Sequence, residues 1–255
     1  MTSSPSVIGV IPARYNSYRL PGKPLAMIGE KTMIQWVYEQ ASLARNLSQV
    51  LVATDDSRIE DAVQQFGGNV VMTSKSCQSG TDRVAEAVQN LEVDIVVNIQ
   101  GDEPFINPKE VDLVADILIH DSEAFMGTLV KRIFHVDELT SINTAKVIIN
   151  KKGYALYFSR NPIPFYRDLK DPKEWLKSHS YYKQIGIYSY RKSFLNQITQ
   201  WAPSPLEISE KLEQLRVLEH GFLIKVAETD SEAICVDTPE DLERVRQIHT
   251  SENEK

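Results

Sequence analysis

Three permanent cations, Arg14, Arg19 and Lys23, fall within ten positions of one another near the N-terminus. They follow an apolar run at residues 7–11 that predicts a buried strand, and three prolines and a glycine punctuate residues 11–25. Because proline fixes φ and disfavours helix, we expect a shaped loop at the end of that strand. Arginine binds phosphate through paired N–H groups and lysine adds a point charge. The loop therefore predicts a pyrophosphate or triphosphate site, with a solvated basic loop as the alternative.

Two acidic residues could hold a metal ion near such a loop. Asp102 follows the strongest apolar run, residues 94–99, and Gly101 beside it would let a ligand approach closely. Asp237 lies between a short apolar run and a predicted helix start. Mg²⁺ is usually bound by one or two carboxylates, with water and substrate phosphates completing its shell, so both are candidate ligands. Each residue also has a structural alternative to metal binding: Asp102 could simply form a turn, and Asp237 could interact with the helix dipole.

A third polar segment, at residues 78–83, lies at another predicted helix start and contains Gln78, Ser79, Gly80 and Arg83. Free backbone N–H groups at a helix start suit an anion, and a glutamine amide can read both donors and acceptors on a nucleobase. Ordinary capping by Ser79 is the alternative.

Patterns for covalent catalysis are missing from the sequence. The five histidines form no pair or motif, and there is neither a Gly-x-Ser-x-Gly segment nor a Cys/His arrangement. This favours a reaction driven by positioning and a metal ion.

The elements that must position these residues alternate strand and helix over the first half of the chain. The alternation predicts an α/β fold with a doubly wound, mostly parallel sheet, in which ligands bind at the carboxyl ends of the strands. We expect strands at residues 7–11, 50–53, 70–72 and 94–99, and helices at residues 32–44, 56–66 and 82–91.

The second half predicts a smaller, partly antiparallel sheet and then more helix. We expect a single domain over residues 1–255, with a main part at 5–123 and 201–250 and an annex at 124–200. Apolar residues between Phe158 and Tyr166 could form a dimer contact or pack on the main sheet. The expected annex strands are residues 125–131, 145–150, 154–159 and 185–190, with a hairpin turn at 151–153 and a loop at 161–175. The expected later elements are helices at 191–200 and 206–218, strands at 223–226 and 234–236, and a final helix capped by Thr238.

Composition limits the kind of protein. A net charge of −7 over 255 residues argues against bulk nucleic-acid binding, so an anionic ligand would need locally gathered positive charge or a metal. The sequence has no apolar run long enough to span a membrane and no basic segment ahead of its first apolar run, so we expect neither a membrane span nor a secretory signal. Cys77 and Cys235 lie far apart, which fits a reduced, cytoplasmic setting.

Seven motifs appear in an order that resembles one family, 3-deoxy-manno-octulosonate cytidylyltransferase, also called CMP-Kdo synthetase. The resemblance spans nearly the whole chain and implies a nucleotide-diphospho-sugar transferase-like fold in a homodimeric, Mg²⁺-dependent enzyme. Such an enzyme joins CTP to 3-deoxy-manno-octulosonate (Kdo), giving CMP-Kdo and pyrophosphate for lipopolysaccharide synthesis. The motifs are IPARY…RLPGKPL (11–25), QSGTDR (78–83), NIQGDEP (98–104), YALYFSR (154–160), IGIY (185–188), LEQLRVL (212–218) and VDTPEDL (236–242).

The resemblance also implies a role for individual residues. Arg14 and Lys23 would bind the CTP phosphates, and Asp102 and Asp237 would bind Mg²⁺; these four form the expected catalytic set. The expected nucleotide contacts further include the backbone of Ala13 and the side chains or backbone of Gln78, Ser79, Gly80 and Arg83. The residues expected to line the sugar-acid pocket are Arg19, Gln100, Arg160, Gln184, Tyr188, Glu213 and Gln214.

Two departures from the family pattern lie near the expected sugar pocket. Gln184 stands where the family commonly has histidine, and Ser209 stands where it carries an apolar residue. A neutral amide keeps hydrogen bonding but cannot become cationic. A cytidylyltransferase for a modified sugar acid such as 8-amino-Kdo is therefore an alternative. Outside this class, the alternatives are a glycosyltransferase that consumes a finished nucleotide sugar and an inactive nucleotide-binding protein.

Overall fold

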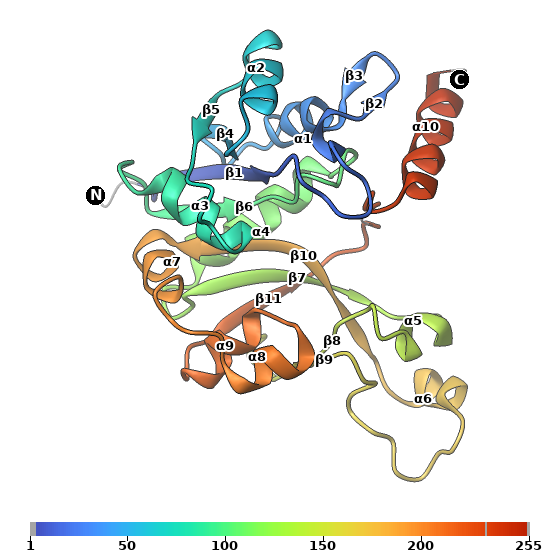
Figure 1. The fold of residues 1–255 in the computed structure, drawn as a ribbon. Helices are drawn as coiled ribbons and strands as arrows, with labels where there is room; N and C mark the ends of the chain where they lie inside the picture. The colour runs from blue at the N-terminus through green and yellow to red at the C-terminus, as the bar shows by residue number, and fades with distance from the viewer. Residues whose placement is uncertain (1–3, 233, 254–255) are drawn as a thin grey trace.

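The computed structural model describes residues 4–232 and 234–253. Residues 1–3, on which the expectation of no secretory signal partly rests, lie outside it. A mixed sheet of nine described strands runs through the molecule, with helices on both faces (Figure 1). Its main path runs in the order β11, β7, β10, β6, β1, β4, β5. The strands of this sheet are β1 (Val7–Ala13), β4 (Gln49–Thr54), β5 (Val70–Met72), β6 (Ile95–Asn98), β7 (Met126–Arg132), β8 (Lys146–Ile149), β9 (Ala155–Ser159), β10 (Tyr182–Arg191) and β11 (Ile224–Glu228).

The described strands β1, β4, β5 and β6 are mutually parallel neighbours, as the alternation of strand and helix predicts. Strand β1 is buried on both faces. Val10 packs into the core beneath α3, whereas Ile11 packs into the core beneath α1. A strand covered on both faces must be apolar throughout, which explains the unbroken apolar run at residues 7–11.

The antiparallel part of the sheet is centred on β10. This strand runs antiparallel to β6 and β7, and its beginning also pairs with β8, which forms a hairpin with β9. Gly153, with φ of 78°, lies in the turn of this hairpin, so the predicted turn is confirmed. The fold class is confirmed as well. However, β7 and most of β10 lie inside the main sheet, so the annex is a branch of that sheet rather than a separate one.

The helices cover both faces of the sheet. Helix α4 was not predicted, although Asn107 caps it and a proline occupies its first turn. The described helices are α1 (Met33–Ala41), α2 (Ser57–Gln65), α3 (Gly80–Val88), α4 (Pro108–His120), α5 (Val136–Thr140), α6 (Pro172–Ser178), α7 (Lys192–Ile198), α8 (Pro205–Glu210), α9 (Gln214–Glu219), α10 (Pro239–Asn253) and the 3-10 helix η1 (Lys23–Leu25). No described helix combines the length and apolar character needed to cross a bilayer.

Three local predictions were wrong. The helix expected at residues 206–218 is broken into α8 and α9 at Lys211, whose φ is 54°. Residues 234–236 form no strand, and the loop expected at 161–175 runs into α6. Of the apolar residues between Phe158 and Tyr166, Phe158 of β9 is fully buried in the core, as the alternative of packing on the main sheet predicts, whereas Phe165 is exposed.

A small third core holds the C-terminal helix against the N-terminal loop. Helix α10 stands away from the main sheet, beside the hairpin of β2 (Met27–Ile28) and β3 (Lys31–Thr32) (Figure 1). Leu242 and Val245 of α10 pack with Ile28 and Met33, and Arg246 donates to the Met27 carbonyl at 2.9 Å. This packing places the start of α10 beside the predicted phosphate loop.

Candidate active site

The predicted phosphate loop follows β1 and folds back on itself. The Gly22 N–H donates to the Tyr15 carbonyl at 2.9 Å, and Gly22 adopts a φ of 70°, which is costly for any other residue. The 3-10 helix η1 begins at the next residue, Lys23. The loop is therefore a closed turn that directs the Lys23 side chain toward the carboxyl end of β6.

Lys23 contacts both predicted metal ligands. Its Nζ lies 2.7 Å from Asp102 Oδ2 and 3.2 Å from Asp237 Oδ1, and Arg19 lies 3.0 Å from the other oxygen of Asp237. Burial by itself lowers the pKa of Lys23, but the ion pairs and hydrogen bonds with Asp102 and Asp237 together outweigh it and raise the pKa. Two cations and two carboxylates thus gather at one point.

Backbone contacts bring the two carboxylates together. The Val236 N–H donates to the Asp102 carbonyl at 2.9 Å, which ties the two segments side by side. Thr238 and Asp241 then form the predicted capping box of α10, and the Asp237 N–H also donates to the Asp241 carboxylate, at 3.1 Å. A side chain at Gly101 would lie 3.0 Å from the Pro12 carbonyl oxygen, so this glycine serves the packing of the loop on β1.

The carboxylate pair suits a hard divalent cation. Both carboxylates converge on one cation, the Lys23 ammonium, so their oxygens are close enough to act on a single positive charge. Across residues 4–232 and 234–253, no group of three or more His, Cys, Asp or Glu could hold a metal. Mg²⁺ needs only one or two protein carboxylates, because phosphate oxygens and water complete its shell.

Arg14 and the start of α3 form a second part of the site. Arg14 Nη2 donates to the Gln78 carbonyl at 3.1 Å, and Ser79 caps α3 in a capping box with Asp82. A cavity of about 470 Å³ lies here, and Arg58, Lys75 and Arg83 line it together with Arg14. The sequence reasoning missed Arg58 and Lys75, because isolated surface cations carry no motif.

Arg83 is held by the protein rather than free in this cavity. It is fully buried, pairs with Asp55 at 3.2 Å and donates to Thr73 Oγ1 at 2.5 Å. Its Nε has no described hydrogen-bond partner. The Gln78 side chain also turns back, donating to the Ser76 carbonyl at 2.8 Å. The nucleotide contacts expected of these two side chains stay predictions.

Six of the seven predicted sugar residues divide into a lining and a layer behind it, while Arg19 lies at the edge of Asp237. Gln100, Arg160, Gln184 and Tyr188 line a cavity of about 450 Å³, together with the two predicted metal ligands, Asp102 and Asp237. Glu213 and Gln214 lie behind it, where Gln214 Nε2 donates to Gln184 Oε1 at 2.5 Å and Thr81 donates to Glu213 at 3.1 Å. Gln214 therefore reaches the cavity through Gln184, whereas Glu213 is held by Thr81 of α3.

Buried titratable groups surround this cavity. Burial and the nearby Glu213 raise the pKa of the Tyr188 hydroxyl, and burial also raises the pKa of Glu213. Glu103, which follows Asp102 directly, also lines the cavity and accepts a hydrogen bond from Cys235 at 3.4 Å. Burial, with a contribution from Asp102, raises the pKa of Glu103 to about 7.

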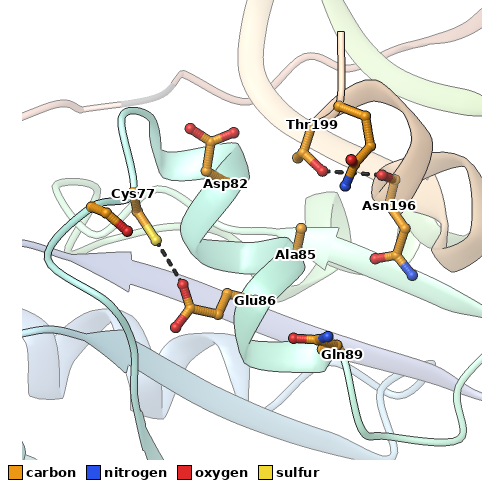
Figure 2. Close-up of a pocket in the computed structure, with 9 residues that line it drawn as sticks. Cys77, Asp82, Ala85, Glu86, Gln89, Asn196 and Thr199 are labelled. Atoms are coloured by element: carbon orange, nitrogen blue, oxygen red, sulfur yellow. Dashed lines mark hydrogen bonds between the residues drawn. The ribbon is translucent and has the colours of Figure 1, made fainter.

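A further cavity of about 560 Å³ lies between α3 and α7 (Figure 2). Glu86 on its wall accepts hydrogen bonds from the Cys77 thiol and from the Ser74 N–H. Burial and the hydrogen bond to Glu86 raise the pKa of Cys77 to about 11, so the thiol stays neutral. The described residues that line it include no lysine or arginine.

Comparisons with known proteins agree on one family. A family model described as cytidylyltransferase matches residues 8–243. A protein of Cytophaga hutchinsonii named 3-deoxy-manno-octulosonate cytidylyltransferase is 51% identical over 253 residues, covering 98% of this chain and 100% of its own. A protein of the same name from Bacteroides thetaiotaomicron is 52% identical, covering 94% of this chain and 97% of its own. A solved CMP:2-keto-3-deoxy-manno-octonic acid synthetase in complex with CTP superposes with a TM-score of 0.91 at 42% identity, covering 97% of this chain and 99% of that one.

Proposed function

The chain belongs to the 3-deoxy-manno-octulosonate cytidylyltransferase family, and from this premise we propose that it joins CTP to Kdo, releasing pyrophosphate. The product, CMP-Kdo, would serve lipopolysaccharide synthesis. One observation carries the proposal: Lys23, Asp102 and Asp237 converge at the carboxyl end of the sheet, and both carboxylates also line the cavity that holds the predicted sugar residues. Under this proposal, a phosphate-binding cation, a metal site and a sugar pocket would share one wall.

In the proposed reaction, the C2 hydroxyl oxygen of Kdo forms a bond to the α-phosphorus of CTP. The bond to the bridging oxygen of the β-phosphate breaks, pyrophosphate leaves, and the hydroxyl proton passes to solvent. Arg14 and Lys23 would bind the phosphates and stabilise the charge that develops there. Lys23 would move from the two carboxylates to the phosphates, a short displacement because its side chain is flexible.

We propose Mg²⁺ as the metal, held by Asp102 and Asp237. When bound, Mg²⁺ would neutralise charge on the phosphates and lower the pKa of a hydroxyl group beside it. Once Asp237 binds the metal, Arg19 would be released to pair with the carboxylate of the sugar acid. In the described structure its guanidinium pairs with the half-exposed Asp237 carboxylate. Gln184, held by Gln214, would orient sugar hydroxyls through hydrogen bonds.

A panel of sugar acids tests the proposal. We expect pyrophosphate release from CTP with Kdo and little with N-acetylneuraminate. Because Gln184 is neutral where the family commonly has histidine, 8-amino-Kdo belongs in the panel, and a large preference for it would move the assignment to the modified sugar. A glycosyltransferase would release no pyrophosphate with any acceptor, and an inactive nucleotide-binding protein would bind CTP without turnover.

The proposal extends to a homodimer in the cytoplasm. Support for the dimer comes from exposed apolar side chains on the antiparallel branch, Leu156 on β9 and Phe165, which packs edge-on against Trp175. Sedimentation velocity tests this, with Leu156→Asp as the variant: we expect a dimer for the unmodified chain and a shift toward monomer for the variant. The two free cysteines fit the reducing compartment in which CTP is made.

A further inference from the structure

Lys146 is a fully buried cation, with 0% of its surface exposed. Its Nζ donates to the carbonyls of Ser141 at 2.7 Å and Thr144 at 2.6 Å, and to the carbonyl of Arg160. The three ammonium hydrogens are therefore matched by three backbone oxygens. Among the described residues, no carboxylate lies within ion-pair distance of it. A buried charge without a counter-ion costs free energy, so an apolar side chain at this position would cost less to bury. We infer that the lysine is needed as the donor to the three carbonyls.

These carbonyls belong to a wall of the sugar cavity. Residues 141–145 form the turn before β8, and Asn143 and Thr144 of this turn line the cavity. Lys146 holds the turn from one side through two of its carbonyls. Arg160 holds it from the other, because Nη1 of its guanidinium donates to the Ile142 carbonyl at 2.9 Å.

Arg160 also holds a second wall of the sugar cavity, the segment between α8 and α9. Its Nε donates to the Glu210 carbonyl at 2.6 Å and its Nη2 to the Lys211 carbonyl at 3.1 Å, while its backbone N–H donates to the Glu210 carboxylate. These contacts fix the break between α8 and α9, where Lys211 adopts its left-handed conformation. Leu212, which lines the cavity, and Gln214, which holds Gln184, follow directly.

We propose that Lys146 is a positioning residue for the sugar-acid half of the reaction: it fixes the turn at 141–145 and the backbone of Arg160, and through them two walls of the sugar cavity. The inference rests on the proposed function for its substrate. A methionine at this position would fill the same space but take the Lys146 donor from all three carbonyls; among the described residues, the Ser141 carbonyl would keep the Thr144 N–H at 3.3 Å, whereas no other donor is described for the carbonyls of Thr144 and Arg160. Burial and the nearby Arg160 lower the pKa of Lys146 to about 8, with Glu210 acting in the opposite direction, in line with the cost of burying an ammonium group.

Steady-state kinetics of Lys146→Met test the proposal, with KM measured separately for Kdo and CTP. We expect the KM for Kdo to rise about tenfold or more while the KM for CTP stays within about twofold. Lys146→Gln keeps two N–H donors without the charge. We expect its KM for Kdo to lie between those of the unmodified protein and Lys146→Met. The matched control is Lys225→Met, which makes the same charge change on β11, where Lys225 pairs with Asp121 outside the cavity.

Hydrogen–deuterium exchange of the ligand-free proteins gives a readout that needs no turnover. We expect faster exchange at residues 141–145 in Lys146→Met and Lys146→Gln, with residues 33–54 unchanged. Equal effects on both KM values, no effect on the KM for Kdo, or unchanged exchange at 141–145 would each overturn the proposal. If Lys146→Met does not fold, Lys146→Gln decides in its place. Failure of the unmodified enzyme to use Kdo would instead count against the proposed function, and the exchange comparison would still decide the positioning.

Discussion

On the nucleotide side of the site, Lys23 pairs with Asp102 and Asp237, whose side chains are 26% and 42% exposed, whereas on the sugar side Lys146 is wholly buried among backbone carbonyls. Exposed ion pairs contribute little stability and exchange readily. A buried ammonium with all its donors matched is fixed in place. The difference indicates that the nucleotide side is built to exchange its partners when phosphates and metal arrive, while the sugar side is formed in advance.

The largest expected effect comes from removing a carboxylate shared by both sides. Asp102→Ala should lower turnover with CTP, Kdo and Mg²⁺ on the order of a hundredfold or more, because a proposed metal ligand acts directly on charge in the transition state. The measurement is kcat from pyrophosphate release, with Asp61→Asn on the exposed face of α2 as the control. Near-normal turnover of Asp102→Ala would remove the metal assignment.

Glu103 tests the contrast between exposed and buried charged groups within one segment, because it follows the partly exposed Asp102 directly and is itself buried. Its folded-state pKa of about 7 lies above the ordinary value of 4.5, so the folded state holds the proton more tightly than the unfolded state. The contribution of the protonated Glu103 carboxyl to the free energy of unfolding is thus fully present below about pH 4.5 and is lost as pH rises toward 7. In the metal-free unmodified protein, ionisation of Glu103 should lower the free energy of unfolding by about 2 kcal/mol between pH 5 and 8. Glu103→Gln should not show this decrease, because a glutamine does not ionise.

Chemical denaturation at several pH values measures this effect. The expected result is a weaker fall in the free energy of unfolding with rising pH for Glu103→Gln than for the unmodified protein. Parallel pH profiles for the two proteins would show that the Glu103 carboxyl titrates as it does in the unfolded chain.

The exchange of partners at Lys23 is the next test. Lys23→Met should bind Mn²⁺ without nucleotide about tenfold or more tightly than the unmodified protein, because a cation no longer lies between Asp102 and Asp237. Free Mn²⁺ is measured by electron paramagnetic resonance. Lys31→Met, which makes the same charge change at the surface pair with Glu39, is the matched control. Equal Mn²⁺ affinity in the unmodified protein and Lys23→Met would mean that Lys23 does not compete with the metal.

The smallest effect is expected on the sugar side. Gln184→His should shift the ratio of kcat/KM for Kdo over 8-amino-Kdo a few-fold toward Kdo, because a histidine that becomes cationic repels an ammonium group. The KM for CTP should not change. A shift toward 8-amino-Kdo, or a change confined to CTP, would place Gln184 outside the sugar site.

The sequence predicted the nucleotide side better than the sugar side. Asp102 follows β6 at the carboxyl edge of the parallel strands, and Asp237 precedes α10, so both positions are marked by a regular element, whereas the Val236–Asp102 backbone contact that joins them is tertiary. Helix α4 was also within reach, since Val111, Val114, Ala115 and Leu118 repeat at helical spacing behind the Asn107 cap.

The sugar side depends on contacts that no local pattern encodes. The break at Lys211 follows from carbonyls held by Arg160, fifty residues away in the chain, and nothing in residues 206–218 signals a left-handed residue there. The layered arrangement of Gln184 and Gln214 likewise comes from the pairing of β10 with β7 and from the placement of α9. Local propensity does not decide such tertiary contacts.

Pyrophosphate release by the unmodified protein, with one component omitted at a time, tests the central claim most directly. The account predicts release that requires CTP, Kdo and Mg²⁺ together, with one CMP-Kdo formed for each pyrophosphate. Release of pyrophosphate without Kdo, or no release with all three present, would contradict it.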